Sequence, residues 1–221
     1  MLVFLICNGI GGVLMKKFNI IRVRKFLEIA LLAKAFAIAA PKPVALTPIG
    51  PQGCGKTSLG LYLSRKIRSF EMISQDEIRK SLFLQMYPEE NGVGFERIYE
   101  ALRPKEPEIR RKAIEALKSS AKEVVYVDRM NLTPASRSDF IIPERFNVAI
   151  YFDLPLDEIL RRHKNRPDKV LAIPDHIVIS CFNMAEFPKR DEFDARVILS
   201  PIRITREESG HRKDKGNLSN E

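Results

Sequence analysis

Residues 50–57 read Gly-Pro-Gln-Gly-Cys-Gly-Lys-Thr, a complete G-x-x-x-x-G-K-T pattern. The glycines of such a loop let backbone N–H groups turn inward around phosphates, the lysine reaches the β- and γ-phosphates, and the threonine hydroxyl can hold Mg²⁺. A strand-like run, 44–49, precedes the pattern, and an amphipathic helical run, 57–68, follows it. A helix in that place adds its N-terminal partial charge to the same anion. The stretch therefore predicts a nucleoside triphosphate site, and its flanks disfavour a fortuitous glycine-rich turn.

Short apolar, β-rich runs alternate with helical stretches along the chain. The predicted strands are 44–49, 70–74, 124–127 and 148–152, with 196–199 as a fifth candidate. The predicted helices are 57–68, 76–86, 95–102, 107–122, 157–164 and 175–184. This alternation is typical of an α/β fold with a parallel sheet of about four to five strands and helices on both faces. Ligands of such a sheet gather at the carboxyl ends of its strands.

Length and composition indicate one catalytic domain with extensions. A chain of 221 residues with 45% hydrophobic content can bury one sizeable core. We expect a basic amphipathic extension over 1–43, a phosphate-loop domain over 44–204 and a polar, disordered tail over 205–221. The extension has seven Lys or Arg residues against one acid, Glu28, and so carries most of the net charge of +9.

Three interpretations of the N-terminal extension stay open. The basic run 16–40 has an apolar helical face, which suits either a helix packed on the domain or an organelle-targeting or membrane-surface helix. The third interpretation is a protein that starts at Met15. The apolar stretch 1–14 is too short to cross a bilayer, so we expect no integral membrane span.

The cysteines favour a reducing compartment. Cys7, Cys54 and Cys181 are an odd number without C-x-x-C spacing, which argues against a disulfide framework and against a zinc site. We therefore expect a cytoplasmic protein, with an organelle as the alternative location.

An acid and an arginine follow the second predicted strand. Asp76 and Arg79 are one helical turn apart in Ser-Gln-Asp-Glu-Ile-Arg, residues 74–79, and can face the same cleft. In phosphoryl transfer to a hydroxyl, such a carboxylate orients the acceptor and takes its proton, and such an arginine holds an anionic group. A helix N-cap and a surface charge would use the same residue types, so both interpretations stay open.

Two further groups of charged residues follow predicted strands. Asp128 closes the third strand, where a carboxylate can approach Mg²⁺, its waters or the acceptor, or can simply form a turn. Arg161, Arg162 and Arg166 follow the fourth strand. Arg162 and Arg166 are four residues apart, so one face can present both to a phosphate as a closing lid does. A solvated basic helix end is the alternative.

Residues 44–184 together resemble the polynucleotide 5′-hydroxyl kinase branch of the phosphate-loop kinases, which includes the phage end-healing kinase and the kinase domain of fungal-type tRNA ligases. The resemblance implies that Lys56 and Thr57 bind donor phosphates and metal, and that Asp76 is the general base. It also implies that Arg79 contacts a phosphate of the acceptor strand and that Arg166, the last arginine of the lid, clamps the donor phosphates.

One segment departs from the phage-type pattern. Asp128 is followed by Arg-Met-Asn-Leu-Thr-Pro, residues 129–134, which is one residue longer and closer to the tRNA-ligase kinase domain. The longer spacing leaves the role of Asn131 open. The sequence has no Lys-x-Asp-Gly ligase signature and no Asp-x-Asp-x-Thr phosphatase element, so such a kinase would act alone or beside a separate ligase or phosphatase.

The expected reaction is transfer of the γ-phosphate of ATP or GTP, with Mg²⁺, to a 5′-hydroxyl end of RNA or DNA in end healing or RNA repair. The expected catalytic residues are Lys56, Asp76, Arg79, Asp128 and Arg166. The expected donor-binding residues are Gly50, Gly53, Cys54, Gly55, Lys56, Thr57, Ser58, Arg162 and Arg166, with Thr57 as the metal ligand and Asp128 as a second candidate. Two alternatives stay open: a small-molecule kinase for sugars, nucleosides or other metabolites, and an ATP-binding switch or adaptor.

Overall fold

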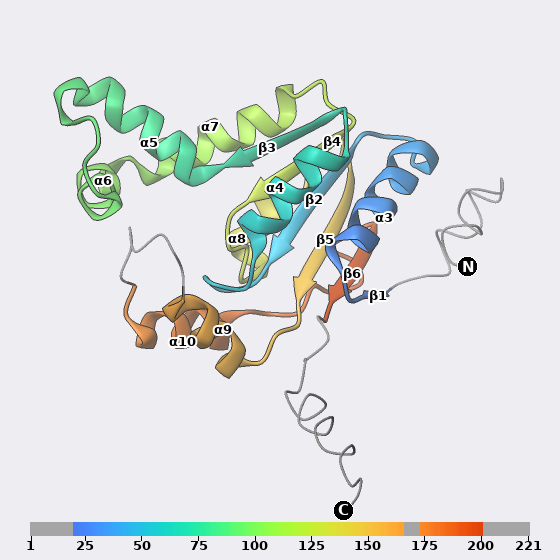
Figure 1. Cartoon of the computed structure of the whole chain (residues 1–221). Coiled ribbons are helices and arrows are strands. Elements are labelled where there is room, and N and C mark those ends of the chain that lie inside the picture. The colour runs from blue at the N-terminus through green and yellow to red at the C-terminus, as the bar shows by residue number, and fades with distance from the viewer. Residues whose placement is uncertain (1–19, 166–172, 201–221) are drawn as a thin grey trace, which may run out of the picture.

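The computed structural model describes residues 20–165 and 173–200, which fold around one parallel β-sheet (Figure 1). Its spatial strand order is β1-β6-β5-β2-β4-β3, and all neighbouring strands are parallel. The strands are β1 (Ile21–Val23), β2 (Val44–Ile49), β3 (Phe70–Ser74), β4 (Val124–Asp128), β5 (Phe146–Phe152) and β6 (Ala195–Leu199). The predicted α/β fold with a parallel sheet is therefore confirmed.

The described part of the sheet has six strands, and the prediction of about four to five was too low. The additional strand, β1, is only three residues long and pairs Ile21 with Val197 and Val23 with Leu199 of β6. Its residues read Ile-Arg-Val inside a strongly basic segment. A run this short shows no recognisable alternation, and its place at the sheet is set by a partner strand far away in the sequence.

Helices cover both faces of the sheet (Figure 1). They are α3 (Phe26–Ala39), α4 (Lys56–Lys66), α5 (Gln75–Met86), α6 (Phe95–Leu102), α7 (Glu106–Ser119), α8 (Pro134–Arg137), α9 (Leu156–Lys164) and α10 (Asp175–Met184). The helix predicted over 107–122 begins at Glu106, with Pro107 in its first turn, and ends at Ser119. Within the described ranges, no helix is both long enough and apolar enough to cross a membrane.

Alternation along the central strands supplies two hydrophobic layers. Val44 and Leu46 of β2 pack into the cluster that α3 and α4 close, whereas Ala45 between them packs toward α7. Successive side chains of a strand point to opposite faces, so one apolar strand serves both layers. The central strand β2 is buried along its whole length, which fixes the height and direction of the loop that follows it.

The N-terminal segment from residue 20 onward takes part in this architecture. The helix α3 buries Ile29, Leu32 and Phe36 in the same cluster that contains the sheet residues Val148 and Val197. Residues 1–19, the lid segment 166–172 that contains Arg166, and the predicted tail 205–221 lie outside the described residues.

Candidate functional site

The phosphate loop connects the end of β2 to the start of α4. Gly53 and Gly55 have φ angles of +83° and +103°, a left-handed region that non-glycine residues adopt at a steric cost. A Cβ atom at Gly53 would also lie 3.2 Å from the carbonyl oxygen of Ile159 in α9. The N–H of Gly50 donates to the carbonyl of Met130 at 3.1 Å, which joins the loop to the segment after β4. The glycine positions of the pattern thus shape the loop and set its close approach to α9.

Lys56 lies at the centre of this loop. Its side chain is buried, and Nζ donates to the carbonyl oxygens of Gly50 at 2.9 Å and Pro51 at 2.6 Å. The sheet holds the first turn of α4 in place, because the hydroxyl of Tyr126 in β4 donates to the Lys56 carbonyl at 2.8 Å. The ammonium group is therefore held inside the loop, where the oxygens of a bound phosphate chain would gather.

Cys54 contributes a buried side chain to the same loop. Its Sγ lies 3.7 Å from Lys56 Nζ, and burial raises the pKa of the thiol despite the nearby ammonium. A neutral thiol buried in this way is a packing group. What Cys54 can offer to a phosphate is its backbone N–H.

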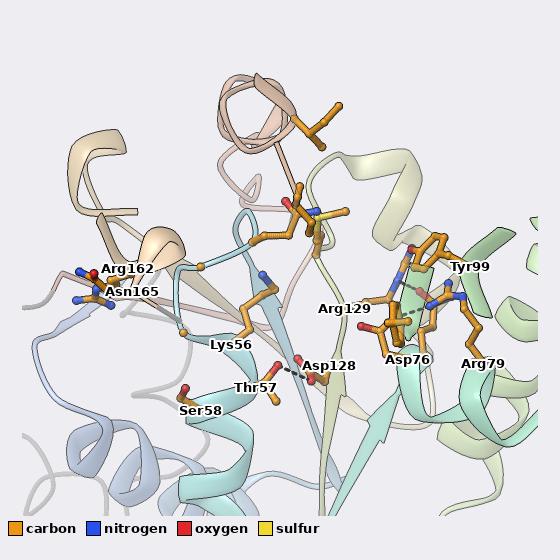
Figure 2. Close-up of a pocket in the computed structure, with 18 of the residues that line it drawn as sticks. Lys56, Thr57, Ser58, Asp76, Arg79, Tyr99, Asp128, Arg129, Arg162 and Asn165 are labelled. Carbon is orange, nitrogen blue, oxygen red and sulfur yellow. Dashed lines mark hydrogen bonds and ion pairs between the residues drawn. The ribbon is translucent and has the colours of Figure 1, made fainter. Parts of the chain in front are cut away.

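Thr57 and Asp128 bring two oxygen ligands together at the ends of α4 and β4. Thr57 Oγ1 donates to Asp128 Oδ2 at 2.9 Å (Figure 2). Burial raises the pKa of Asp128, while the Thr57 hydrogen bond and the charge of Lys56 oppose that rise. A hydroxyl and a carboxylate are hard oxygen donors of the kind that Mg²⁺ prefers, and Mg²⁺ in phosphate sites commonly takes only one or two protein ligands. The pair fits the metal that the sequence predicts.

On the other side of Asp128, the start of α5 presents Asp76. Its side chain is 62% exposed, whereas the Arg79 side chain is 2% exposed. Arg79 pairs with Asp76 and also with Glu106 of α7, at 2.8 Å between Nη2 and Oε1. The Arg79 guanidinium stacks over the ring of Tyr99 in α6, 4.1 Å from its centroid. Asp76 and Arg79 therefore share one site, and Glu106 and Tyr99 belong to it as well.

In α9, the helix that the sequence predicts as a lid, Arg161 and Arg162 both form ion pairs with Glu158. Glu158 accepts hydrogen bonds from Arg161 at 2.7 Å and from Arg162 at 2.6 Å, and these bonds lower the pKa of Glu158 to about 2. Arg162 is one-third exposed and faces the phosphate loop. Arg166, the second predicted lid arginine, lies outside the described residues.

One cavity of about 760 Å³ connects these groups. Figure 2 shows Lys56 and Thr57 in its middle, with Arg162 on one side and Asp76 on the other. Of the predicted site residues, those that line the cavity are Gly53, Gly55, Lys56, Thr57, Ser58, Asp76, Arg79, Asp128 and Arg162. Side chains that sequence reasoning did not assign to the site also line it, among them Phe26, Gln75, Phe95, Tyr99 and Ile177.

These additional residues had little sequence signal. Phe26 belongs to a segment that composition separates from the domain, and Phe95 and Tyr99 lie on an amphipathic helix whose apolar face looks like ordinary core. The positions four apart on α6 would have placed Phe95 and Tyr99 on one face, and that spacing was the one available clue.

No protein-family model matches this sequence, and no curated protein matches it. Among solved structures, a gluconokinase from Sinorhizobium meliloti 1021 is 15% identical, with 72% of this chain and 85% of that chain covered and a TM-score of 0.47. A shikimate kinase from Acinetobacter baumannii is 21% identical, covers 77% and 88%, and has a TM-score of 0.47. A fungal RNA kinase is 18% identical, with 73% of this chain and 39% of that chain covered and a TM-score of 0.49.

Proposed function

We propose that this chain is a polynucleotide 5′-hydroxyl kinase, which transfers the γ-phosphate of ATP or GTP to a 5′-hydroxyl end of RNA or DNA. The observation that carries the proposal is the cavity that runs from the phosphate loop to the exposed carboxylate of Asp76, with Phe95 and Tyr99 on its wall. The two rings pair at 5.4 Å between centroids. Aromatic side chains beside a catalytic carboxylate suit an acceptor that carries a nucleobase, because bases stack on such rings.

The residues divide the reaction between the two ends of the cavity. Lys56 and the loop N–H groups would bind the donor phosphates, and Thr57 and Asp128 would hold Mg²⁺, which neutralises phosphate charge when bound. The acceptor oxygen forms a bond to the γ-phosphorus as the bond from that phosphorus to the β–γ bridging oxygen breaks. The hydroxyl proton passes to Asp76, and the nucleoside diphosphate leaves.

Arg79 and Glu106 support Asp76 in this scheme. Arg79 holds one oxygen of the Asp76 carboxylate, and Glu106 holds the Arg79 guanidinium in place. A base fixed in this way needs little rearrangement when the acceptor arrives. The proposed lid role of Arg162 would require this side chain to exchange Glu158 for a donor phosphate.

Transfer of labelled γ-phosphate from ATP and from GTP tests the proposal. We expect label on 5′-hydroxyl oligonucleotides and none on a panel of sugars, sugar acids and hydroxy acids. Label on a small molecule alone would replace the proposal with a small-molecule kinase. Nucleotide hydrolysis that no acceptor changes would identify a nucleotide-dependent switch instead.

Substitution Asp76→Asn tests the assigned base. The amide keeps the size of the side chain and can still accept from Arg79, but it cannot take the proton. We expect kcat to fall roughly 10²-fold or more while ATP affinity stays near the wild-type value. Glu77→Gln, at the exposed neighbouring position, is the matched control and should leave both values unchanged. A collapse of ATP affinity in Asp76→Asn would make Asp76 part of the donor site and not the base.

A further inference from the structure

The acceptor end of the cavity has two arginines, Arg79 and Arg129, whose hydrogen-bond partners differ in charge. Every guanidinium nitrogen of Arg79 donates to a carboxylate. Nε and Nη2 bind Glu106 at 3.0 and 2.8 Å, and Nη1 binds Asp76. This cluster places two carboxylates against one guanidinium, so its net negative charge repels a further anion. Arg79 therefore has no free donor nitrogen with which to bind a phosphate.

Arg129 forms no ion pair within the described residues, and its hydrogen bonds there go to neutral groups. Its Nε donates to Gln75 Oε1 at 2.9 Å, and Nη1 donates to Asn131 Oδ1 at 3.3 Å and to the Ser136 carbonyl. The described part of the chain offers Nη2 no hydrogen-bond partner. The guanidinium also stacks over the ring of Phe140, 4.4 Å from its centroid. Arg129 is thus held in one orientation while its charge stays uncompensated by an ion pair.

The position of Arg129 follows from the segment after β4. Asn131, which is buried, donates to the Pro48 carbonyl of β2 at 2.8 Å, and this bond ties the turn to the strand that precedes the phosphate loop. Arg129 directly follows the candidate metal ligand Asp128, and Figure 2 shows it beside Tyr99 and Asp76. The guanidinium of an arginine stays protonated in proteins, so this side chain is a cation at neutral pH.

We infer that Arg129, rather than Arg79, binds the acceptor strand, through its Nη2 group and a phosphate next to the 5′-terminal nucleoside. The inference rests on the proposed function and deepens it. With the 5′-hydroxyl at Asp76, the nucleobase can approach Tyr99 and Phe95. The following phosphate then meets Arg129, which forms no ion pair within the described residues. Arg79 then positions Asp76, and Arg129 reads the phosphate.

Two acceptors that differ by one phosphate test this inference: a 5′-hydroxyl nucleoside and the same nucleoside carrying a 3′-monophosphate. For Arg129→Gln we expect the KM of the phosphorylated acceptor to rise about 10- to 100-fold, as loss of a charged hydrogen bond predicts. The KM of the plain nucleoside and the affinity for ATP should stay near wild type. On a longer oligonucleotide, the slope of log KM against log salt should fall by about one. Arg129→Lys should recover part of the loss.

Arg110→Gln is the matched control. Arg110 is a neighbouring cation that pairs with Asp139 at 2.7 Å and stacks over Phe140, but it does not line the cavity. The Arg110→Gln variant should leave the KM of both acceptors unchanged. Equal loss on both acceptors in Arg129→Gln, or no loss on either, overturns the inference while the proposed function stands. A wild-type protein that phosphorylates no nucleoside, nucleotide or oligonucleotide overturns both.

Discussion

The ammonium group of Lys56 is already oriented for binding an anion. A buried ammonium group is costly unless hydrogen bonds replace its water, and the carbonyls of Gly50 and Pro51 supply them. Both acceptors belong to the loop, so the loop holds the ammonium group in place before any nucleotide arrives. The third N–H of the ammonium donates to Cys54 Sγ at 3.7 Å, a weak contact that it can exchange for an oxygen of the donor phosphates.

We expect Lys56→Ala to lower kcat for transfer roughly 10²- to 10³-fold or more, because a preorganised cation is lost where negative charge develops. The melting temperature should change little, since the side chain contacts loop carbonyls and not the apolar layers. Lys66→Ala, at the exposed end of the same helix, is the control and should retain wild-type kcat. Near-normal transfer by Lys56→Ala would remove the phosphate loop from the mechanism.

Local patterns located the individual site residues better than they defined their partners. The spacing of Asp76 and Arg79 predicts that they share a cleft, and the ion pair between them agrees. The partner that occupies most of Arg79, Glu106, is 27 residues further along and reaches it only through the packing of α7 on α5. Whether an arginine is available to a ligand depends on such distant carboxylates, which a local pattern does not contain.

At the scale of elements, α4 depends on close contact with the sheet at Gly60. A Cβ atom there would lie 2.5 Å from Met72 Sδ and 3.1 Å from the Tyr126 ring. The methionine end is flexible, but the buried tyrosine is also bonded to Lys56 and cannot move freely. The glycine therefore sets the distance between the helix and β4.

We expect Gly60→Ala to lower the free energy of unfolding by about 1 kcal/mol. Alanine favours the helix by about 1 kcal/mol over glycine, but overpacking a fixed ring costs about 1–3 kcal/mol, and the second effect is larger. Ser64→Ala, on the exposed side of α4, should leave urea denaturation within about 0.5 kcal/mol of wild type. Stabilisation by Gly60→Ala would show that Tyr126 yields and that the contact is loose.

The central strands were predictable because burial on both faces makes them continuous apolar runs. The runs 44–49 and 70–74 coincide with β2 and β3, and 148–152 lies inside β5. Among the strands of the described residues, β1 alone was not predicted, because three residues carry too little pattern and the partner strand β6 is more than 170 residues away in the sequence. A long element can be predicted from its local sequence pattern, whereas a short edge strand forms only because a neighbouring strand pairs with it.

At the scale of the whole molecule, we propose that residues 20–43 form part of the catalytic unit. The helix α3 buries Phe36, whose ring lies 5.5 Å from that of Phe146 in β5, and the same helix begins with Phe26 at the cavity. A segment that closes one face of the sheet and lines the cavity is expected to contribute to stability and to nucleotide binding together.

We expect Phe36→Ala to lower the free energy of unfolding by about 3 kcal/mol, the usual cost of removing a buried ring. Ile38→Ala, on the same helix at 83% exposure, should change it by less than about 0.5 kcal/mol. Denaturant titration of both variants decides the matter. Two equally small effects would mean that the segment is an appendage, separate from a core that begins at β2.

The pairing of β1 with β6 sets the order in which the sheet can assemble during synthesis. The first described strand, Ile21–Val23, binds the last one, Ala195–Leu199. During synthesis β1 can therefore pair with β6 only after the residues of β6 have left the ribosome. Contacts between such distant residues also slow the last step of folding, because a long loop must close before they form. Until β6 and β1 are added, the sheet of the nascent chain has an unpaired edge at β5. We expect chaperones to act mainly at this edge.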